Sequence, residues 1–178
     1  AGNLCNASPA ADSVPAMVAV GAVARIAGPN GVRDVPVEEV PTAPGRTSLA
    51  KGEFVLSIFF PKKAANTGDA YLRFIPRTEM DIAVVGSGVC LTLDESGTCT
   101  EAKVALGAVA PTVILVPDAA SALVGTKVDE AAIEAAGAAA TDAAKPISDK
   151  RGTVEYRKKV AGVLTRRALA TALQRAKG

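Results

Sequence analysis

A small group of polar residues near the N-terminus has the composition of an anion-binding helix start. Gly2 and Asn3 are followed by Ser8 and Asp12, immediately before a predicted helix. The free amides and positive dipole end of a helix can receive a phosphate, and Asn, Ser and Asp side chains can bond ligand hydroxyls. The alternative is structural: Asn3 and Ser8 make turn hydrogen bonds and Asp12 caps the helix. The pattern alone leaves both open.

A second group brings two cations close to an otherwise apolar pair of predicted strands. Arg73 lies within the first strand, Arg77 follows it, and Asp81 and Ile82 begin the next segment. Arginines in this position can meet an anionic ligand. The alternative is a solvated strand edge that carries an Arg77–Asp81 ion pair. Neither group identifies a cofactor by itself.

The composition excludes several classes of chemistry. The chain has no histidine, so it lacks the usual general base near neutral pH, the usual metal ligand and the base of a Ser-His or Cys-His pair. The three cysteines, Cys5, Cys90 and Cys99, have no CxxC spacing. We expect buried free thiols, the alternative being a Cys90–Cys99 bridge across a hairpin. A reducing, cytoplasmic location fits this usage.

Charge and hydropathy also limit the partners. The formal net charge is only +2, and the chain has two tyrosines, four phenylalanines and no tryptophan. This argues against a basic, base-stacking surface for nucleic acid. No apolar run approaches the roughly 20 residues that span a bilayer. We therefore expect a soluble protein with neither a nucleic-acid partner nor a membrane span.

The first third of the chain predicts a helix and a small sheet. The helix follows Asp12, runs for about nine residues and ends at Gly21. The β-prone runs 22–27 and 32–37 flank the turn cluster Gly-Pro-Asn-Gly and predict a hairpin, and a further strand is expected at 53–60. The small, polar stretch 62–68 is typical of a linker between two domains.

The remainder predicts three strands and then helices. The strands are expected at 70–75, 82–93 and 98–106, as an antiparallel meander, and the helices at 118–124, 129–144 and 153–176. One face of the last helix should pack on the sheet, and the other face should be polar. The expected packing face is Tyr156, Val160, Val163, Leu164, Ala168 and Ala172, and the expected polar face includes Arg157, Lys158, Lys159, Thr165 and Arg166.

Taken together, these segments resemble the flavin subunits of molybdenum hydroxylases, the family of xanthine dehydrogenase and carbon monoxide dehydrogenase. The resemblance covers nearly the whole chain, and several motifs in one order are more specific than a lone glycine pattern. The segments are AGN at 1–3, SPAAD at 8–12, GRT at 45–47, GE at 52–53, Arg77 with MDIA at 80–83, LGAVAPT at 106–112, PISDKRG at 146–152 and EYR at 155–157.

The resemblance implies an α+β fold with two parts. Residues 1–61 would be the end of a two-lobed flavin-binding domain, and residues 67–178 a C-terminal domain in which a three-stranded antiparallel sheet packs against a helical bundle. The first flavin lobe, which carries a glycine-rich phosphate loop in the family, has no match in the chain. We therefore expect a fragment or one half of a split subunit, completed by the missing N-terminal lobe or a companion chain.

The resemblance also implies the site and the activity. The cofactor would be FAD, and the candidate contacts, carried over by position, are Gly2, Asn3, Ser8, Asp12, Val55, Arg73, Arg77, Asp81 and Ile82. No residue is expected to be catalytic by itself or to bind metal. Electrons would pass from a molybdenum centre and 2Fe-2S clusters in partner subunits, through FAD, to an acceptor. Alternatives are an assembly module that has lost flavin binding, and a flavin oxidase of the vanillyl-alcohol oxidase type.

Overall fold

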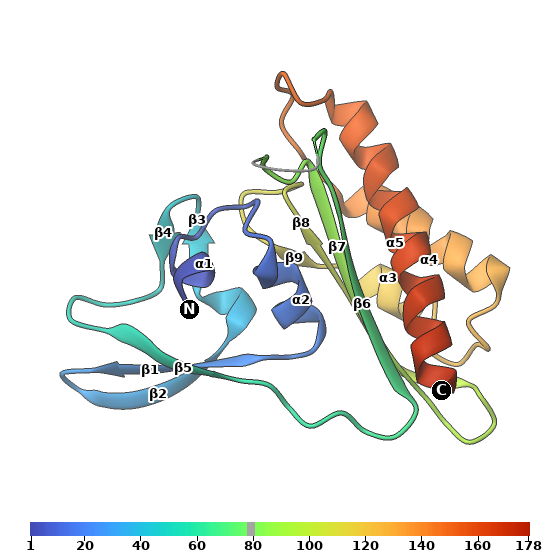
Figure 1. The fold of residues 1–178 in the computed structure, drawn as a ribbon, viewed down its shortest axis with the longest axis horizontal. Coiled ribbons are helices and arrows are strands. Elements are labelled where there is room, and N and C mark those ends of the chain that lie inside the picture. Colours follow the sequence, from blue (N-terminus) through green and yellow to red (C-terminus); the bar gives the residue numbers. More distant parts are fainter. Residues whose placement is uncertain (78–80) are drawn as a thin grey trace.

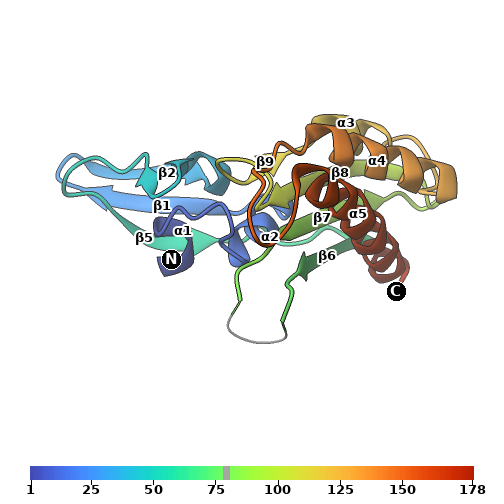
Figure 2. The same ribbon diagram turned by 90° about the horizontal axis from the view of Figure 1, so that it is seen from above.

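The computed structural model describes residues 1–77 and 81–178 and places two main sheets in an elongated molecule (Figures 1 and 2). Met80, part of the MDIA segment, lies outside the described residues. The elements are α1 (Gly2–Cys5), α2 (Ser13–Ala19), β1 (Val23–Gly28), β2 (Gly31–Pro36), a 3-10 turn η1 (Val37–Glu39), β3 (Pro41–Ala43), β4 (Arg46–Thr47), β5 (Phe54–Phe59), β6 (Thr67–Phe74), β7 (Val85–Leu93), β8 (Cys99–Gly107), β9 (Ile114–Leu115), α3 (Pro117–Ser121), α4 (Glu130–Ala143) and α5 (Val154–Lys177).

The first sheet contains the predicted hairpin and the strand predicted at 53–60. Its order is β2-β1-β5, and both pairs are antiparallel. Gly28 pairs with Gly31 where β1 turns into β2, and Gly31 has a φ of 108°, which a glycine adopts without strain. The inner face of this sheet packs with α1 and α2 on a core that includes Leu4, Val18 and Ile26. The short β3–β4 pair lies beside it.

The second sheet has four strands, in the order β6-β7-β8-β9, all antiparallel. The predicted meander is present, but the prediction of three strands is wrong because β9 adds a fourth. β9 is only two residues long, and Leu106 and Ala105 of β8 pair with it. A strand of this length has no periodicity that a sequence pattern can show, so only the tertiary pairing defines it.

Helices α3, α4 and α5 cover one face of the second sheet, with α5 lying along β6 and β7 (Figure 1). Their starts follow the local sequence: the Asp129 carboxylate accepts a hydrogen bond from the Ala132 N–H, and the Thr153 hydroxyl accepts one from the Tyr156 N–H. Close packing on the sheet needs glycine, because a Cβ on Gly68 would lie 1.9 Å from the carbonyl oxygen of Ala172 in α5.

The predicted packing face of α5 is wrong in part. Tyr156 is exposed and only touches the ring of Phe74 edge-on, whereas Arg157 and Thr165, expected on the polar face, are buried. The Thr165 and Ser87 hydroxyls are 3.0 Å apart, and the Arg157 guanidinium donates hydrogen bonds from Nη1 and Nη2, whereas its Nε has no partner among the described residues. Burying a polar side chain costs little free energy when it makes hydrogen bonds. The buried face of α5 therefore extends beyond its apolar stripe.

Helix α2 packs on the opposite face of the second sheet and thereby joins the two sheets. A Cβ on Gly88 would lie 2.4 Å from the carbonyl oxygen of Pro15, and one on Gly107 would lie 2.6 Å from the Pro15 ring. The absence of side chains at these two strand positions lets α2 approach the sheet. Because α2 ends at Ala19, it covers only part of that face.

The linker is shorter than predicted. Thr67 and Gly68 already belong to β6, where they pair with Thr92 and Leu91. The three cysteines are free thiols, as expected, but only Cys99 is buried, whereas Cys5 and Cys90 are half-buried; Cys90 and Cys99 are not cross-strand partners. Burial raises the pKa of both thiols.

Among the described residues, no helix is long and apolar enough to cross a membrane. The division into residues 1–61 and 67–178 stays a prediction.

Candidate functional site

The most specific contact between the two sequence groups is an ion pair of Asp12 with Arg73. Asp12 precedes α2 in a helical conformation, and its side chain makes no capping hydrogen bond, so the predicted cap is wrong. Instead, its Oδ2 pairs with Nη1 of Arg73 on β6. Its Oδ1 is shielded from solvent and has no hydrogen-bond partner among the described residues. A shielded carboxylate oxygen without a donor is costly unless a ligand supplies one.

Tyr71 belongs to the same site, although sequence reasoning did not select it. It lies two residues before Arg73 on β6, so both side chains stand on the same face of the strand. Burial, together with the negative charge of Asp12, raises the pKa of Tyr71 to about 12. The phenol therefore stays a neutral hydrogen-bond donor. The i, i+2 spacing with Arg73 is the signal that could have identified it.

The N-terminal residues form an ordered support next to Asp12. The Asn3 Oδ1 accepts hydrogen bonds from the Ser13 N–H, at 3.0 Å, and from the Ser13 hydroxyl, at 2.7 Å. Among the described residues its amide nitrogen makes no hydrogen bond, so it can serve as a donor. A Cβ on Gly2 would meet nothing within 4 Å, so the backbone of Gly2 borders open space. The turn alternative applies to Ser8, whose hydroxyl accepts a bond from the Ala10 N–H at 3.3 Å.

The Arg77–Asp81 ion pair that the spacing allowed is present, with Nε and Oδ2 3.3 Å apart. The Asp81 carboxylate also accepts a bond from the Ile82 N–H and lies 3.5 Å from Nε of Arg151. These donors, the Ile82 N–H first, lower the pKa of Asp81. The carboxylate is therefore ionised at neutral pH and fixes Arg151, a residue of the PISDKRG segment that sequence reasoning left without a role.

Ser8 and Ile82 come together at a second place, a cleft of about 320 Å³ that we call the Ser8 cleft. Arg157 of α5 lies in its wall. The Arg157 Nη2 donates to Asp149 Oδ1 at 2.6 Å, and its Nη1 donates to the Ala108 carbonyl at 3.4 Å. The Ala108 N–H in turn donates to the Pro9 carbonyl at 2.7 Å. Arg157 thus supports the backbone next to Ser8, a role that no local pattern indicates.

Val55 lies apart from all the other candidate residues. It lies on the inner face of β5, where it pairs with Ile26 and packs against the first core. The candidates therefore fall into two groups: Asn3, Asp12 and Arg73 on one side, and Ser8, Arg77, Asp81 and Ile82 on the other, with Gly2 beside Asn3.

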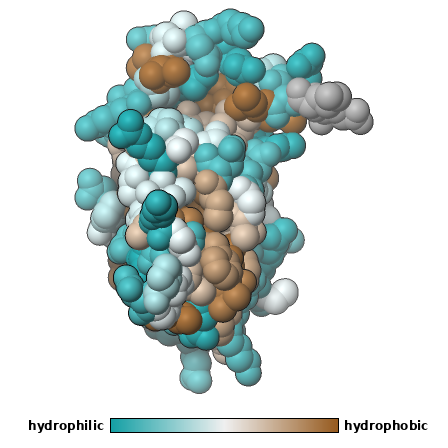
Figure 3. Space-filling model, turned by 90° about the vertical axis from the view of Figure 1, so that its left-hand side faces the viewer, coloured by the Kyte–Doolittle hydropathy of each residue, from teal (hydrophilic) through white to brown (hydrophobic). Residues whose placement is uncertain are grey.

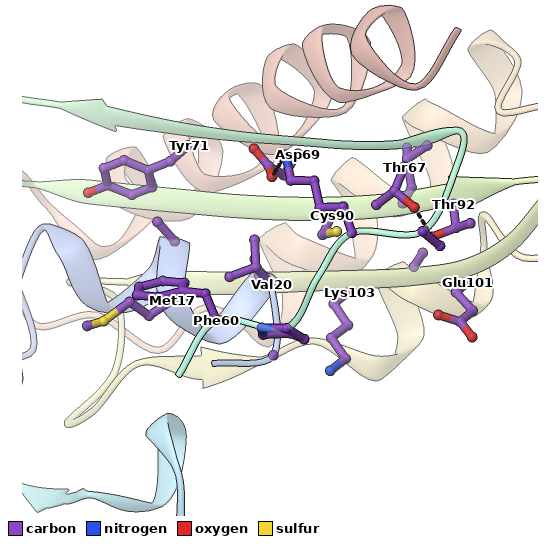
Figure 4. A pocket seen from close by; sticks show the side chains of 18 of the residues that line it. Met17, Val20, Phe60, Thr67, Asp69, Tyr71, Cys90, Thr92, Glu101 and Lys103 are labelled. Atoms are coloured by element: carbon purple, nitrogen blue, oxygen red, sulfur yellow. Dashed lines mark hydrogen bonds and ion pairs between the residues drawn. The ribbon is translucent and has the colours of Figure 1, made fainter. Parts of the chain in front are cut away.

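A larger hollow opens next to Asp12 and Tyr71 (Figure 4). It has a volume of about 1230 Å³ and lies between α2, the 60–64 segment and the part of the second sheet that α2 does not cover. Met17, Val20 and Phe60 give it apolar walls, and Cys90 and Lys103 line its floor. The described residues contain no group of His, Cys, Asp or Glu that could hold a metal ion.

Comparison with known proteins decides the family. Residues 70–172 match the family described as CO dehydrogenase flavoprotein C-terminal domain, and residues 1–63 match the family described as FAD binding domain in molybdopterin dehydrogenase. The chain belongs to this flavoprotein family. The resemblance inferred from the motifs is thereby confirmed.

Members of this flavoprotein family align with the chain from end to end. The carbon monoxide dehydrogenase medium chain of Afipia carboxidovorans is 36% identical over 99% of this chain and 60% of the relative. The putative xanthine dehydrogenase FAD-binding subunit of Escherichia coli is 29% identical over 99% of this chain and 61% of the relative. This chain thus spans about three fifths of the length of these curated relatives.

Solved structures of the family share the fold. A carbon monoxide dehydrogenase from Hydrogenophaga pseudoflava matches with a TM-score of 0.92 and 33% identity, over 98% of this chain and 60% of that chain. Quinoline 2-oxidoreductase from Pseudomonas putida 86 matches with a TM-score of 0.89 and 29% identity, over 99% of this chain and 61% of that chain. These relatives are components of oxidoreductases.

One feature of these residues, the Asp12 carboxylate, is compatible with FAD binding in particular. Asp12 Oδ1 is a shielded acceptor to which no described residue donates, and Arg73 holds the other oxygen of the same carboxylate in place. An isoalloxazine N–H or a ribityl hydroxyl can supply the missing donor. Gly2 leaves open space for a close approach, and Asn3 keeps a free amide donor beside it.

Proposed function

We propose that this chain forms one wall of the FAD site in the flavoprotein subunit of a molybdenum hydroxylase. The Asp12 carboxylate carries the proposal, because a shielded oxygen without a donor, at the junction of the two family domains, needs a ligand to complete it. FAD, when bound, would accept electrons and pass them to an acceptor. The chain's own contribution is to bind and orient the cofactor.

The candidate residues would have different roles in binding FAD. Gly2 and Asn3 would face the pyrophosphate with backbone and side-chain donors. Asp12 would accept a hydrogen bond from the cofactor, and Arg73 would hold its carboxylate in a fixed orientation. Tyr71, which remains neutral, can donate a hydrogen bond at the same place without adding charge.

The second group would act at the edge of this site. Val55, which lies apart from both groups on β5, would contribute a separate apolar contact. Ser8 and Ile82 would line the approach to the cofactor through the Ser8 cleft. Arg77 and Asp81 would hold that edge through their ion pair and the link to Arg151.

The proposal includes partners outside the chain. Substrate oxidation would occur at a molybdenum centre in another subunit, and 2Fe-2S clusters in a third would deliver the electrons. Residues 1–61 would complete the flavin-binding domain together with the first lobe, and residues 67–178 would form the C-terminal domain. The oxidised substrate would not contact this chain.

The test is the flavin content of the purified complex. Asp12→Asn keeps the size of the side chain and removes its charge, so we expect at least a tenfold loss of FAD affinity, about 1.4 kcal/mol. The control is Asp142→Asn, because Asp142 is exposed on α4 and lines neither the hollow beside Asp12 nor the Ser8 cleft. Visible flavin absorbance and titration of the apo complex with FAD measure both variants.

Two results would reject the proposal. An assembled wild-type complex without flavin absorbance would leave the chain as an assembly module. Equal FAD affinity of Asp12→Asn and the wild type would place the cofactor elsewhere. A flavin-containing protein that purifies without molybdenum or iron–sulfur partners would favour the flavin oxidase alternative.

A further inference from the structure

The Ser8 cleft is bordered by exposed apolar residues from four separate segments of the chain. Ile147, between α4 and α5, is 72% exposed, Ile82, before β7, is 53% exposed, and both line the cleft. The exposed Pro44 and Pro111 line it as well. We call these four residues the Ile147 patch. At the upper end of Figure 3, where Figure 1 places the loop between α4 and α5, brown apolar atoms lie among teal hydrophilic ones. Exposed apolar residues that gather at one place within a polar rim are typical of a contact surface.

The charges around the Ile147 patch are mostly positive. Lys145, Arg151 and Arg157 line the cleft, and Asp149 is the one acid among its lining residues. The Asp149 carboxylate is compensated by Nη2 of Arg157, which lies 2.6 Å away. Lys145 and Lys150 are exposed, and neither ammonium group forms an ion pair with a described residue. The rim of the patch therefore carries a positive excess at neutral pH.

The cleft also adjoins the N-terminal loop that would hold the cofactor. Its wall includes residues 8–10, which lie between Asn3 and Asp12 in the sequence. The Pro9 carbonyl accepts a hydrogen bond from the Ala108 N–H at 2.7 Å, and the Ala108 carbonyl accepts one from Arg157 at 3.4 Å. A partner seated on the Ile147 patch would therefore contact this loop from the outside.

We propose that the Ile147 patch is the docking surface for an acidic one-electron carrier protein, which takes the electrons that leave FAD. The positive rim selects an acidic partner by charge complementarity and speeds the encounter. Ile82 and Ile147 would be the apolar anchors. A patch of four residues suits the small contact area, below about 1,200 Å², of transient redox complexes. The inference rests on the proposed function, because that function supplies the reduced flavin.

The electrons and protons of this transfer balance. Each docked carrier would accept one electron, so two oxidised carriers, docking in turn, would convert one FADH2 to FAD. The two protons would pass to solvent. No atom is transferred between the proteins, so the patch needs to supply only contact and orientation.

A small anionic acceptor such as a dinucleotide fits these observations less well. The cleft has a volume of about 320 Å³, at the lower end of the range of about 300–1,000 Å³ for ligand pockets. Most of the Ile147 side chain is open to solvent, where a protein surface can cover it. The positive residues also extend beyond the cleft lining to Lys150.

Carbodiimide cross-linking in the complete complex tests the location. The reagent joins a carboxylate of the carrier to a lysine in contact with it, and the probe is plastocyanin, an acidic blue-copper carrier. We expect linked peptides that contain Lys145 or Lys150, and their loss at high salt concentration, which screens charge attraction. Carrier links found only on other subunits, or no carrier link at all, would overturn the proposal. Links from Lys145 and Lys150 to another subunit of the complex would overturn it too, because the patch would then be buried in the assembly.

Reoxidation of the reduced complex by the same probe gives an independent measure. The double variant Lys145→Glu, Lys150→Glu should lower the second-order rate constant at least tenfold at low ionic strength, with unchanged FAD content. Ile147→Asp should lower it as well, because it removes an anchor and adds a negative charge. Lys177→Glu is the matched control, since it reverses an exposed charge on α5 about 30 Å from Arg157 at 1.5 Å per residue. Equal rate constants for the double variant and the control would contradict the proposal.

The two proposals can fail separately. Cross-linking depends on the docking surface and not on flavin, so a colourless complex with the expected links would reject only the FAD proposal. A flavin-containing complex whose carrier links fall on other subunits would reject only the docking proposal.

Discussion

Arg73 and Asp12 are 61 residues apart in the sequence, and their side chains form the ion pair that joins β6 to the start of α2. The pair connects the segment that matches the FAD-binding family with the segment that matches the C-terminal family. It also leaves one carboxylate oxygen shielded and without a donor. Its contributions to stability and to ligand binding should therefore differ in size.

Arg73→Gln should separate these two contributions. The side chains of Arg73 and Asp12 are 37% and 45% exposed, and exposed pairs contribute only about 0.2–1 kcal/mol to stability. The free energy of unfolding should fall by no more than that, while the FAD affinity of the assembled complex falls about tenfold. Urea denaturation and FAD titration measure the two quantities. A loss of stability without a loss of flavin would assign the pair a structural role alone.

Gly88→Ala should weaken the packing of α2 on the second sheet. The added Cβ would lie 2.4 Å from the Pro15 carbonyl oxygen, so the helix must shift. Overpacking of this kind costs about 1–3 kcal/mol, which the urea midpoint reports. Gly2→Ala is the control, since its Cβ would meet nothing within 4 Å, and its stability should stay within about 0.5 kcal/mol of the wild type.

Arg157→Met should destabilise the protein although it removes a charge from the interior. Arg157 is 5% exposed, and its loss leaves Asp149 without its guanidinium partner and the Ala108 carbonyl without a side-chain donor. Hydrogen bonds to charged groups contribute about 1.5–3 kcal/mol, so a loss of about 2 kcal/mol is expected in denaturant unfolding. Lys159→Met, at an exposed position on the same helix, should change little. Equal effects of the two substitutions would contradict the supporting role of Arg157.

Tyr71 should make stability depend on pH in alkaline solution. Its folded pKa is raised to about 12 from 10.0, because burial and Asp12 oppose ionisation. The unfolded chain therefore loses this proton first, so the stabilisation is complete below pH 10 and is lost as the pH rises to about 12. Tyrosinate absorbance should show a late titration that Tyr71→Phe abolishes. Persistence of the late step in Tyr71→Phe would assign it to another group.

Features that depend on neighbours in the sequence were predictable. The Gly-Pro-Asn-Gly cluster specifies the β1–β2 turn, and the starts of α4 and α5 follow from the capping side chains of Asp129 and Thr153. The uncharged run that forms β5 and the three strands after the linker are likewise local patterns. The motif order identified the family, which the comparisons confirmed. Which residues contact the cofactor stays a prediction.

Features that depend on distant partners required the tertiary structure. Asp12 has the composition of a helix cap, but Arg73 on β6 competes for its carboxylate. Arg157 and Thr165 are polar residues of the kind expected to face solvent, but Ala108, Asp149 and Ser87 give them hydrogen-bond partners inside the protein. The short strand β9 exists only because β8 pairs with it. Sequence patterns record the preferences of each segment, whereas the burial of a polar group depends on partners that folding brings from elsewhere in the chain.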